Sequence, residues 1–219
     1  MGHHNVIQKV KDKVAALISA NLISIKHFKN YFCVFEALGG NLDPSISVVR
    51  TFQWIKPPRN FYKLNIDVSI SGNVAGFGGV IRDSNGLLVA GFTGPLNICD
   101  YNPAMNKTIL YGCQVCTTLN VFNLIIEVNS AFNFIPLVAE VDSCCNANSF
   151  YLIRDIKQQL LCFNYSFHHI MNGGNVCASQ LARWGYDLIR NTDFFRINCP
   201  NQLRGYLKLE ENEVPYVND

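Results

Sequence analysis

No apolar stretch in the 219-residue sequence approaches the roughly 20 residues that a membrane span needs. The N-terminus MGHHNVIQKVKDKV also lacks the unbroken apolar core of a signal peptide. We therefore expect an intracellular protein without a membrane partner, whose nine cysteines stay reduced. Internal repeats and low-complexity tracts are missing too, and an apolar fraction of 49% argues against wholesale disorder.

Net charge is also small, at +2, and it neither favours nor excludes a nucleic-acid partner. Its distribution is uneven, because residues 1–63 hold nine Lys/Arg against three Asp/Glu, and the remainder holds nine against thirteen. Lys9, Lys11 and Lys13 fall in the basic part. They could follow phosphates as a basic arm, or they could form the solvated face of a helix.

The cysteines and histidines do not form a recognisable metal-binding pattern. Cys113 and Cys116 have a C-x-x-C spacing, but they lie in a helical pattern without a second pair or a nearby histidine cluster. We therefore interpret this pair as core packing rather than a zinc or redox site. The pairs His3-His4 and His168-His169 are too isolated to bind a metal alone.

The first half of the chain combines a helical segment with a run of strands. Apolar spacings of three and four predict helix within residues 6–40, and residues 41–59 look like a connector that ends in WIKPP. In KLNIDVSI, from Lys63, apolar and polar residues alternate, which is typical of a half-buried strand. GFGGVIRD and LLVAGFTG, separated by a turn at DSNG, predict two more strands and an antiparallel meander.

Helices and strands alternate in the second half. We expect a helix at 104–120, a buried strand LIIEV from Leu124, a helix at 149–161, a strand YSFHHI from Tyr165 and a last helix at 177–189. The order β-β-β-α-β-α-β-α predicts an α/β protein with a mixed five-stranded sheet and flanking helices. The predicted domains are an N-terminal helical extension with connector (1–59), the main domain (60–190) and a loosely ordered acidic tail (191–219).

Several short sequence motifs, taken in their order along the chain, resemble the ribonuclease H-like domain of plant retroelement-derived, reverse-transcriptase-like proteins. WIKPP leads into KLNIDVS as the family's W-x-x-P-P leads into K-x-N-x-D-G-S/A, and GGVIRDSNG is close to a family hallmark. EVNS resembles the family's E-x-D-S, and HHIMNGGNVCASQLA resembles H-V-x-R-x-x-N-x-x-A-D-x-L-A. The resemblance covers about residues 8–190 and implies the ribonuclease H fold.

The resemblance also implies an activity, the metal-dependent hydrolysis of RNA in an RNA–DNA hybrid. Four carboxylates of that family hold two Mg²⁺ ions, which activate the water and stabilise the leaving oxygen. The four positions fall here on Asp67, Met105, Asn129 and Ser179. Three of the four carboxylates are therefore replaced, and we do not expect a paired metal site.

Neighbouring acids do not restore the set. Glu127 lies two residues before Asn129 on the same strand face, about 6–7 Å away. Asp187 lies eight residues beyond Ser179, roughly 12 Å along a helix. Metal binding, if any, would rest on Asp67 alone.

Three functions stay open at this point. The first is a ribonuclease H-type protein whose cleavage activity is impaired. The second is a module that binds RNA–DNA hybrid or RNA without cleaving it, through Lys56, Arg59, Lys63 and Asn175. Trp54 and Phe61 could stack on bases in such a module, or they could form a packed lid over the sheet. The third is a retroelement remnant that contacts proteins, and the sequence alone does not separate it from the second.

Overall fold

The computed structural model describes residues 3–20, 22, 50–139 and 147–218. Contacts divide the chain into two units, Met1–Thr51 with Val217–Asp219, and Phe52–Tyr216. The first unit contains α1 (His3–Ser19), which confirms the first part of the helix predicted within 6–40; residues 21 and 23–49 lie outside the described residues. Strands β1 (Arg50–Phe52) and β8 (Tyr216–Asn218) pair in a small separate sheet.

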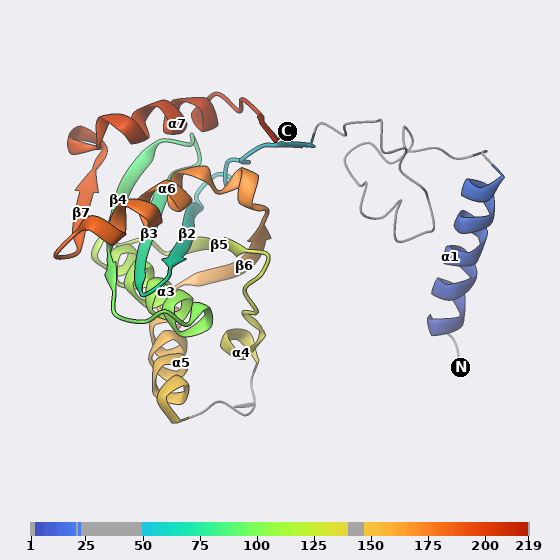
Figure 1. Ribbon diagram of the computed structural model, residues 1–219, viewed down its shortest axis with the longest axis horizontal. Coiled ribbons are helices and arrows are strands. Elements are labelled where there is room, and N and C mark those ends of the chain that lie inside the picture. The colour runs from blue at the N-terminus through green and yellow to red at the C-terminus, as the bar shows by residue number, and fades with distance from the viewer. Residues whose placement is uncertain (1–2, 21, 23–49, 140–146, 219) are drawn as a thin grey trace. The chain divides into compact units, whose positions relative to one another are not determined.

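The second unit contains a six-stranded mixed sheet, which confirms the α/β class (Figure 1). Its strands are β2 (Tyr62–Ser71), β3 (Val74–Arg82), β4 (Leu88–Leu96), β5 (Asn123–Asn129), β6 (Asn164–Ile170) and β7 (Thr192–Phe195), in the order β6-β5-β2-β3-β4-β7. The strands β2, β3 and β4 form the predicted antiparallel meander, and β5 and β6 run parallel to β2.

The prediction of a loosely ordered tail after residue 190 is wrong. Strand β7 pairs with β4 as the sixth strand of the sheet, and helix α7 (Asn201–Glu211) follows it. The remaining helices of this unit are α3 (Tyr101–Thr118), α4 (Ile135–Val138), α5 (Ala147–Leu160) and α6 (Val176–Trp184). The last predicted helix, 177–189, is thus shorter than expected, because a 3₁₀ turn at Gly185–Asp187 ends it. None of the described helices is both long and apolar enough to cross a bilayer.

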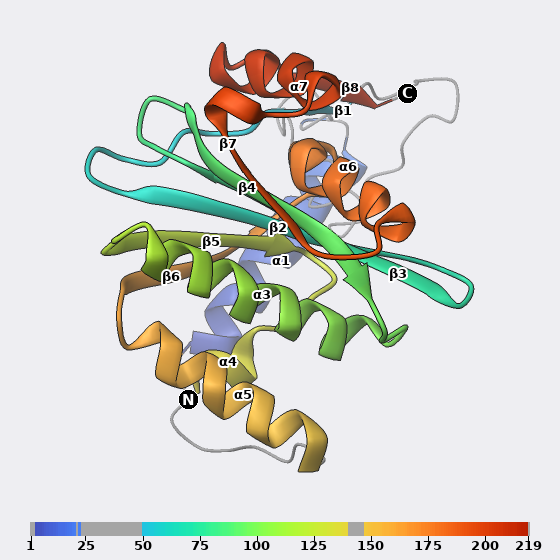
Figure 2. The same ribbon diagram turned by 90° about the vertical axis from the view of Figure 1, so that its left-hand side faces the viewer.

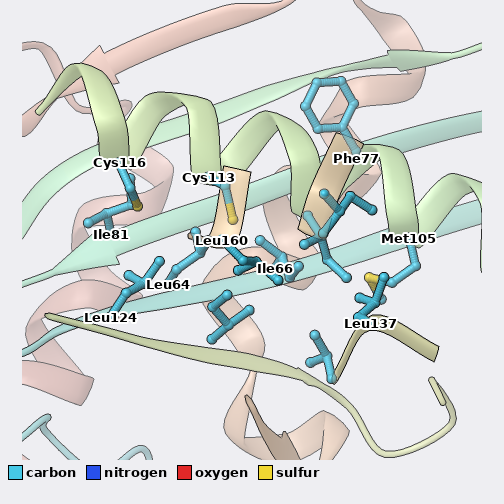
Figure 3. Packing of buried hydrophobic residues seen from close by; sticks show 14 of the residues in the cluster. Leu64, Ile66, Phe77, Ile81, Met105, Cys113, Cys116, Leu124, Leu137 and Leu160 are labelled. Carbon is cyan, nitrogen blue, oxygen red and sulfur yellow. The ribbon is translucent and has the colours of Figure 1, made fainter. Parts of the chain in front are cut away.

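One face of the sheet is covered by α3 and α5, and the other by α6 and α7 (Figure 2). Toward α3, the apolar side chains of β2 meet a large hydrophobic core (Figure 3). Cys113 and Cys116 lie fully buried in it, which confirms their interpretation as core residues. Burial raises the pKa of the Cys113 thiol to about 12, so this thiol stays protonated and unreactive.

The alternate side chains of β2 face α6, and they are the polar ones. Helix α6 can approach this face closely because β3 carries glycine there. A Cβ at Gly78 would lie 2.4 Å from the Cβ of Leu181 and 2.5 Å from the backbone nitrogen of Ala182. The backbone contact cannot be relieved by a side-chain rotation, so glycine at this position sets the distance between the helix and the sheet.

Candidate functional site

Asp67 lies in the middle of β2, opposite Gly78 of β3, and only 8% of it is exposed. One carboxylate oxygen accepts the backbone N–H of Val68 at 2.9 Å, and the other accepts the Ser179 hydroxyl at 2.5 Å. Desolvation by burial raises the pKa of Asp67 above its ordinary value, although both hydrogen bonds and the charge of Arg183 oppose the rise. The carboxylate is therefore held by neutral donors in a poorly hydrated place.

Helix α6 brings Ser179 to Asp67, so the structure places two of the four predicted positions in direct contact. Arg183 follows Ser179 by one helical turn on the same helix and acts electrostatically on Asp67. Helix α6 thus places a hydroxyl against the carboxylate and a positive charge near enough to act on it, where the resemblance implies a further acid at Ser179.

The other two positions lie in different surroundings. Met105 is fully buried in the hydrophobic core on the α3 face, near Leu137 (Figure 3). Asn129 is the last residue of β5, and its side-chain oxygen accepts the backbone N–H of Ala131 at 3.0 Å. One position therefore contributes to the apolar core, and the other stabilises the turn that follows its strand.

Tyr101 is a residue of this site that the sequence did not reveal. It begins α3, one turn before Met105, and its buried hydroxyl has no hydrogen-bond partner among the described residues. Burial and the negative charge of Asp67 raise the pKa of Tyr101 to about 12. The spacing of four residues from Met105 was the available signal, because such residues share a helix face.

These residues do not fit a pair of Mg²⁺ ions. Such ions take several oxygen ligands and depend on carboxylates to offset their mutual repulsion. Here Asp67 is the one carboxylate of the four positions, and the hydroxyl of Ser179 donates to it. Within the ranges that the structure describes, no three His, Cys, Asp or Glu residues are grouped so that they could hold a metal ion.

A buried polar network begins two residues before Asp67 on the same face of β2. Lys63 donates to Glu127 at 2.7 Å, and both side chains are nearly inaccessible to solvent. The Asn65 amide donates to the second Glu127 oxygen at 2.8 Å and to Asn175 at 3.2 Å. Asn175 in turn donates to a backbone carbonyl of β2 at 2.9 Å, so these polar groups satisfy one another.

Arg82 extends this network toward the C-terminal helix. Its guanidinium lies 3.5 Å from the ring centroid of Trp54, donates to Asn65 at 2.7 Å and pairs with the buried carboxylate of Glu210. Trp54 also donates to Asn65 at 2.9 Å, and Tyr216 donates to Glu210 at 3.1 Å. We define the polar core as Trp54, Lys63, Asn65, Arg82, Glu127, Asn175, Glu210 and Tyr216.

The polar core decides where the predicted nucleic-acid contacts lie. Trp54 is completely buried, which agrees with a packed lid and not with a base-stacking platform. Lys63 and Asn175 are 4% and 2% exposed and are engaged inside the polar core, so they are not presented to a ligand. Of the four predicted contacts, Lys56 and Arg59 reach the surface, and Lys56 forms an ion pair with Glu213 at 3.5 Å.

A family model described as reverse transcriptase-like matches residues 65–185, more than half of the chain. The chain belongs to this reverse transcriptase-like family. The matched segment contains all four positions compared above. No curated protein sequence matches the chain.

Several of the solved structures similar to this member of the reverse transcriptase-like family are ribonucleases H. The N-terminal RNase H domain of Rv2228c from Mycobacterium tuberculosis is 15% identical, with a TM-score of 0.53, over 58% of this chain and 94% of that chain. RNase H1 from Halobacterium salinarum is 17% identical, with a TM-score of 0.52, over 58% and 98%. LC11-RNase H1, solved in complex with an RNA/DNA hybrid, is 18% identical, with a TM-score of 0.50, over 57% and 96%. At these identities the likeness shows a shared fold.

Proposed function

We propose that this member of the reverse transcriptase-like family is a ribonuclease H-type domain that does not cleave RNA–DNA hybrids. The observation that carries the proposal is the state of Asp67. It is the one carboxylate of the four positions, and each of its oxygens already accepts one hydrogen bond, from Val68 or from Ser179.

The physical argument concerns charge. Two-metal hydrolysis needs enough negative charge to bring two cations close together, and one carboxylate does not supply it. Met105 offers a soft thioether from the apolar core, which is a poor ligand for a hard cation. Burial raises the pKa of Asp67, so the surroundings stabilise the anion that a metal would need less well than water does.

A cleavage assay tests this proposal. The full chain is incubated with a hybrid labelled on its RNA strand, with Mg²⁺ or Mn²⁺, beside the variant Asp67→Asn as a matched control. We expect both proteins to leave the RNA intact. Cleavage by the wild type that Asp67→Asn abolishes would overturn the proposal, whereas cleavage that both proteins share equally would point to a contaminating nuclease.

A second candidate function is binding of RNA–DNA hybrid without cleavage. It is favoured by Arg183, an exposed cation of α6 that acts electrostatically on Asp67. Arg59 adds positive charge on the segment that leads into β2, where Lys56 is paired with Glu213. Binding that rests on such contacts should weaken steeply with salt.

A gel shift with a short hybrid tests the second candidate. We expect retardation at low ionic strength, and about five-fold weaker binding for Arg183→Gln, since one phosphate contact contributes on the order of 1 kcal/mol. Arg154→Gln is a matched control, because Arg154 lies on α5, across the sheet from α6. No retardation even at low ionic strength would remove this candidate in favour of a protein-contact role.

A further inference from the structure

A pocket of about 380 Å³ lies between the turn that joins β3 to β4 and the C-terminal helix α7. Neither Asp67 nor Arg183 lines it. The turn begins after Arg82, four residues along β3 from the Gly78 that faces Asp67, or about 13 Å of strand. The pocket is thus separate from the site described above.

The pocket is strongly basic. Its charged lining residues are Arg196, Arg204, Lys208 and Glu211. The Nζ of Lys208 lies 3.2 Å from a carboxylate oxygen of Glu211, so these two charges offset each other. Neither arginine has an ion-pair partner among the residues that the structure describes. Two guanidinium charges are therefore left to attract an anion.

Local structure orients the Arg204 side chain and fixes the backbone at Arg196. Arg204 is oriented by its Nε, which donates to the backbone carbonyl of Cys199 at 3.1 Å. Arg196 begins a 3₁₀ turn that Asn198 closes, by accepting the backbone N–H of Phe195 at 2.6 Å. Pre-oriented guanidinium groups bind phosphate oxygens with two parallel hydrogen bonds, which a lysine cannot do.

The other charges near the turn are already engaged. Asp83 accepts the backbone N–H groups of Asn85 and Leu87 at 2.9 Å each, within the turn itself. Lys56, whose stem passes beside the turn, is paired with Glu213. No unpaired carboxylate of the described lining therefore opposes an incoming anion.

The rest of the lining is apolar and leaves room for more than a bare ion. Ile197 is 90% exposed beside Arg196, and Leu87 and Leu207 line the pocket with it. The volume lies within the range typical of small-molecule sites. We propose that this pocket binds a phosphate ester, with the phosphate at Arg196 and Arg204 and the organic part against the apolar wall.

A mononucleotide is a suitable probe, because it combines a phosphate with a flat organic group. In calorimetric titrations of the full chain, we expect AMP to bind and adenosine, which lacks the phosphate, not to bind. The double variant Arg196→Gln/Arg204→Gln should lose at least about ten-fold in AMP affinity, and Arg154→Gln should keep the wild-type affinity. Thermal melts of the variants check that each is folded.

Two sources of the phosphate are distinguished by competition. If a short single-stranded oligonucleotide displaces AMP and binds more weakly to the double variant, the natural ligand is a nucleic-acid backbone. If it does not displace AMP, the ligand is a small phosphorylated molecule. Equal binding of AMP and adenosine, no AMP binding at millimolar concentration, or unchanged AMP affinity in the folded double variant would each overturn the proposal. The outcome is independent of the hybrid assay, which rests on Arg183.

Discussion

Asp67 and Asn65 stand two residues apart on the same face of β2, yet they belong to regions of opposite character. Around Asn65, several residues of the polar core are those that the family motifs have at these positions. Trp54, Arg82 and Glu127 each form a hydrogen bond with Asn65. Around Asp67, three of the four positions carry other residues. The same strand therefore combines a buried polar network with a group of four positions in which Asp67 is the one carboxylate.

The difference between the two regions shows which kinds of residue can be substituted at little cost to the stability of the fold. Each member of the polar core satisfies a buried partner, so removing one leaves a charge or a polar group exposed to an apolar interior. A cluster of acids is different, because without cations its members repel one another and each loses hydration. Neutral residues at these positions, here Met105, Asn129 and Ser179, therefore cost the fold little, although they lack the carboxylates that Mg²⁺ prefers.

The largest effect should come from Arg82, whose charge connects both ends of the polar core. Arg82→Met leaves the buried carboxylate of Glu210 without its partner, and we expect a loss of about 3–5 kcal/mol in the free energy of unfolding. Urea denaturation of the purified variant measures this loss. The double variant Arg82→Met/Glu210→Gln should regain part of it, because the uncompensated charge is gone. A loss below about 1 kcal/mol for the single variant is the range of an exposed ion pair. Such a result would contradict the account in which the Arg82–Glu210 pair stabilises the polar core.

Lys63 should show a smaller effect of the same kind. Lys63→Met removes a donor from Glu127, but Asn65 still donates to the second oxygen of that carboxylate. We expect a loss of about 2–3 kcal/mol in urea denaturation. Arg59→Met, on the exposed residue four positions earlier, is the matched control and should change stability by less than about 0.5 kcal/mol. Equal losses in the two variants would show that the ion pair of Lys63 with Glu127 contributes no more to the free energy of unfolding than an exposed side chain does.

Asp67→Asn should have the smallest effect, and of opposite sign. Burial raises the pKa of Asp67 in the folded state, so the wild type is most stable below the ordinary aspartate pKa and loses stability as the pH rises through the raised value. An asparagine avoids the cost of the buried charge and can still pair with Ser179. We expect the variant to be more stable than the wild type at neutral pH. The two should converge in acid, and urea denaturation at several pH values measures this. If Asp67→Asn were less stable than the wild type at neutral pH, the predicted stabilisation would be contradicted.

Much of the fold was predictable because its signals are local. The alternation in β2 and the turn before Leu87 identified the meander, and the motif order identified the family fold. The sixth strand was missed because β7 is only four residues long, and it is stabilised by pairing with β4 rather than by its own pattern. The last helix was predicted too long because apolar spacing continued past Gly185.

Of the four candidate site positions, the structure brings two into contact, and the other contacts around them were not predictable from the sequence. Motif spacing placed Ser179 opposite Asp67, and the structure joins them. Lys63 resembled a phosphate contact because a lysine on a polar strand face looks exposed in sequence. Its partner Glu127 lies 64 residues away, and Glu210 is still more distant from Arg82. Such long-range pairs leave no local pattern, so the polar core emerged only in three dimensions.

A calorimetric titration with Mg²⁺, run on the wild type and on Asp67→Asn, tests the central claim most directly. That claim is that the Asp67 end of β2 does not hold a pair of metal ions, although the polar core is formed beside it. We predict no saturable heat that depends on Asp67 at millimolar Mg²⁺. A tight two-ion isotherm in the wild type that disappears in Asp67→Asn would contradict the account.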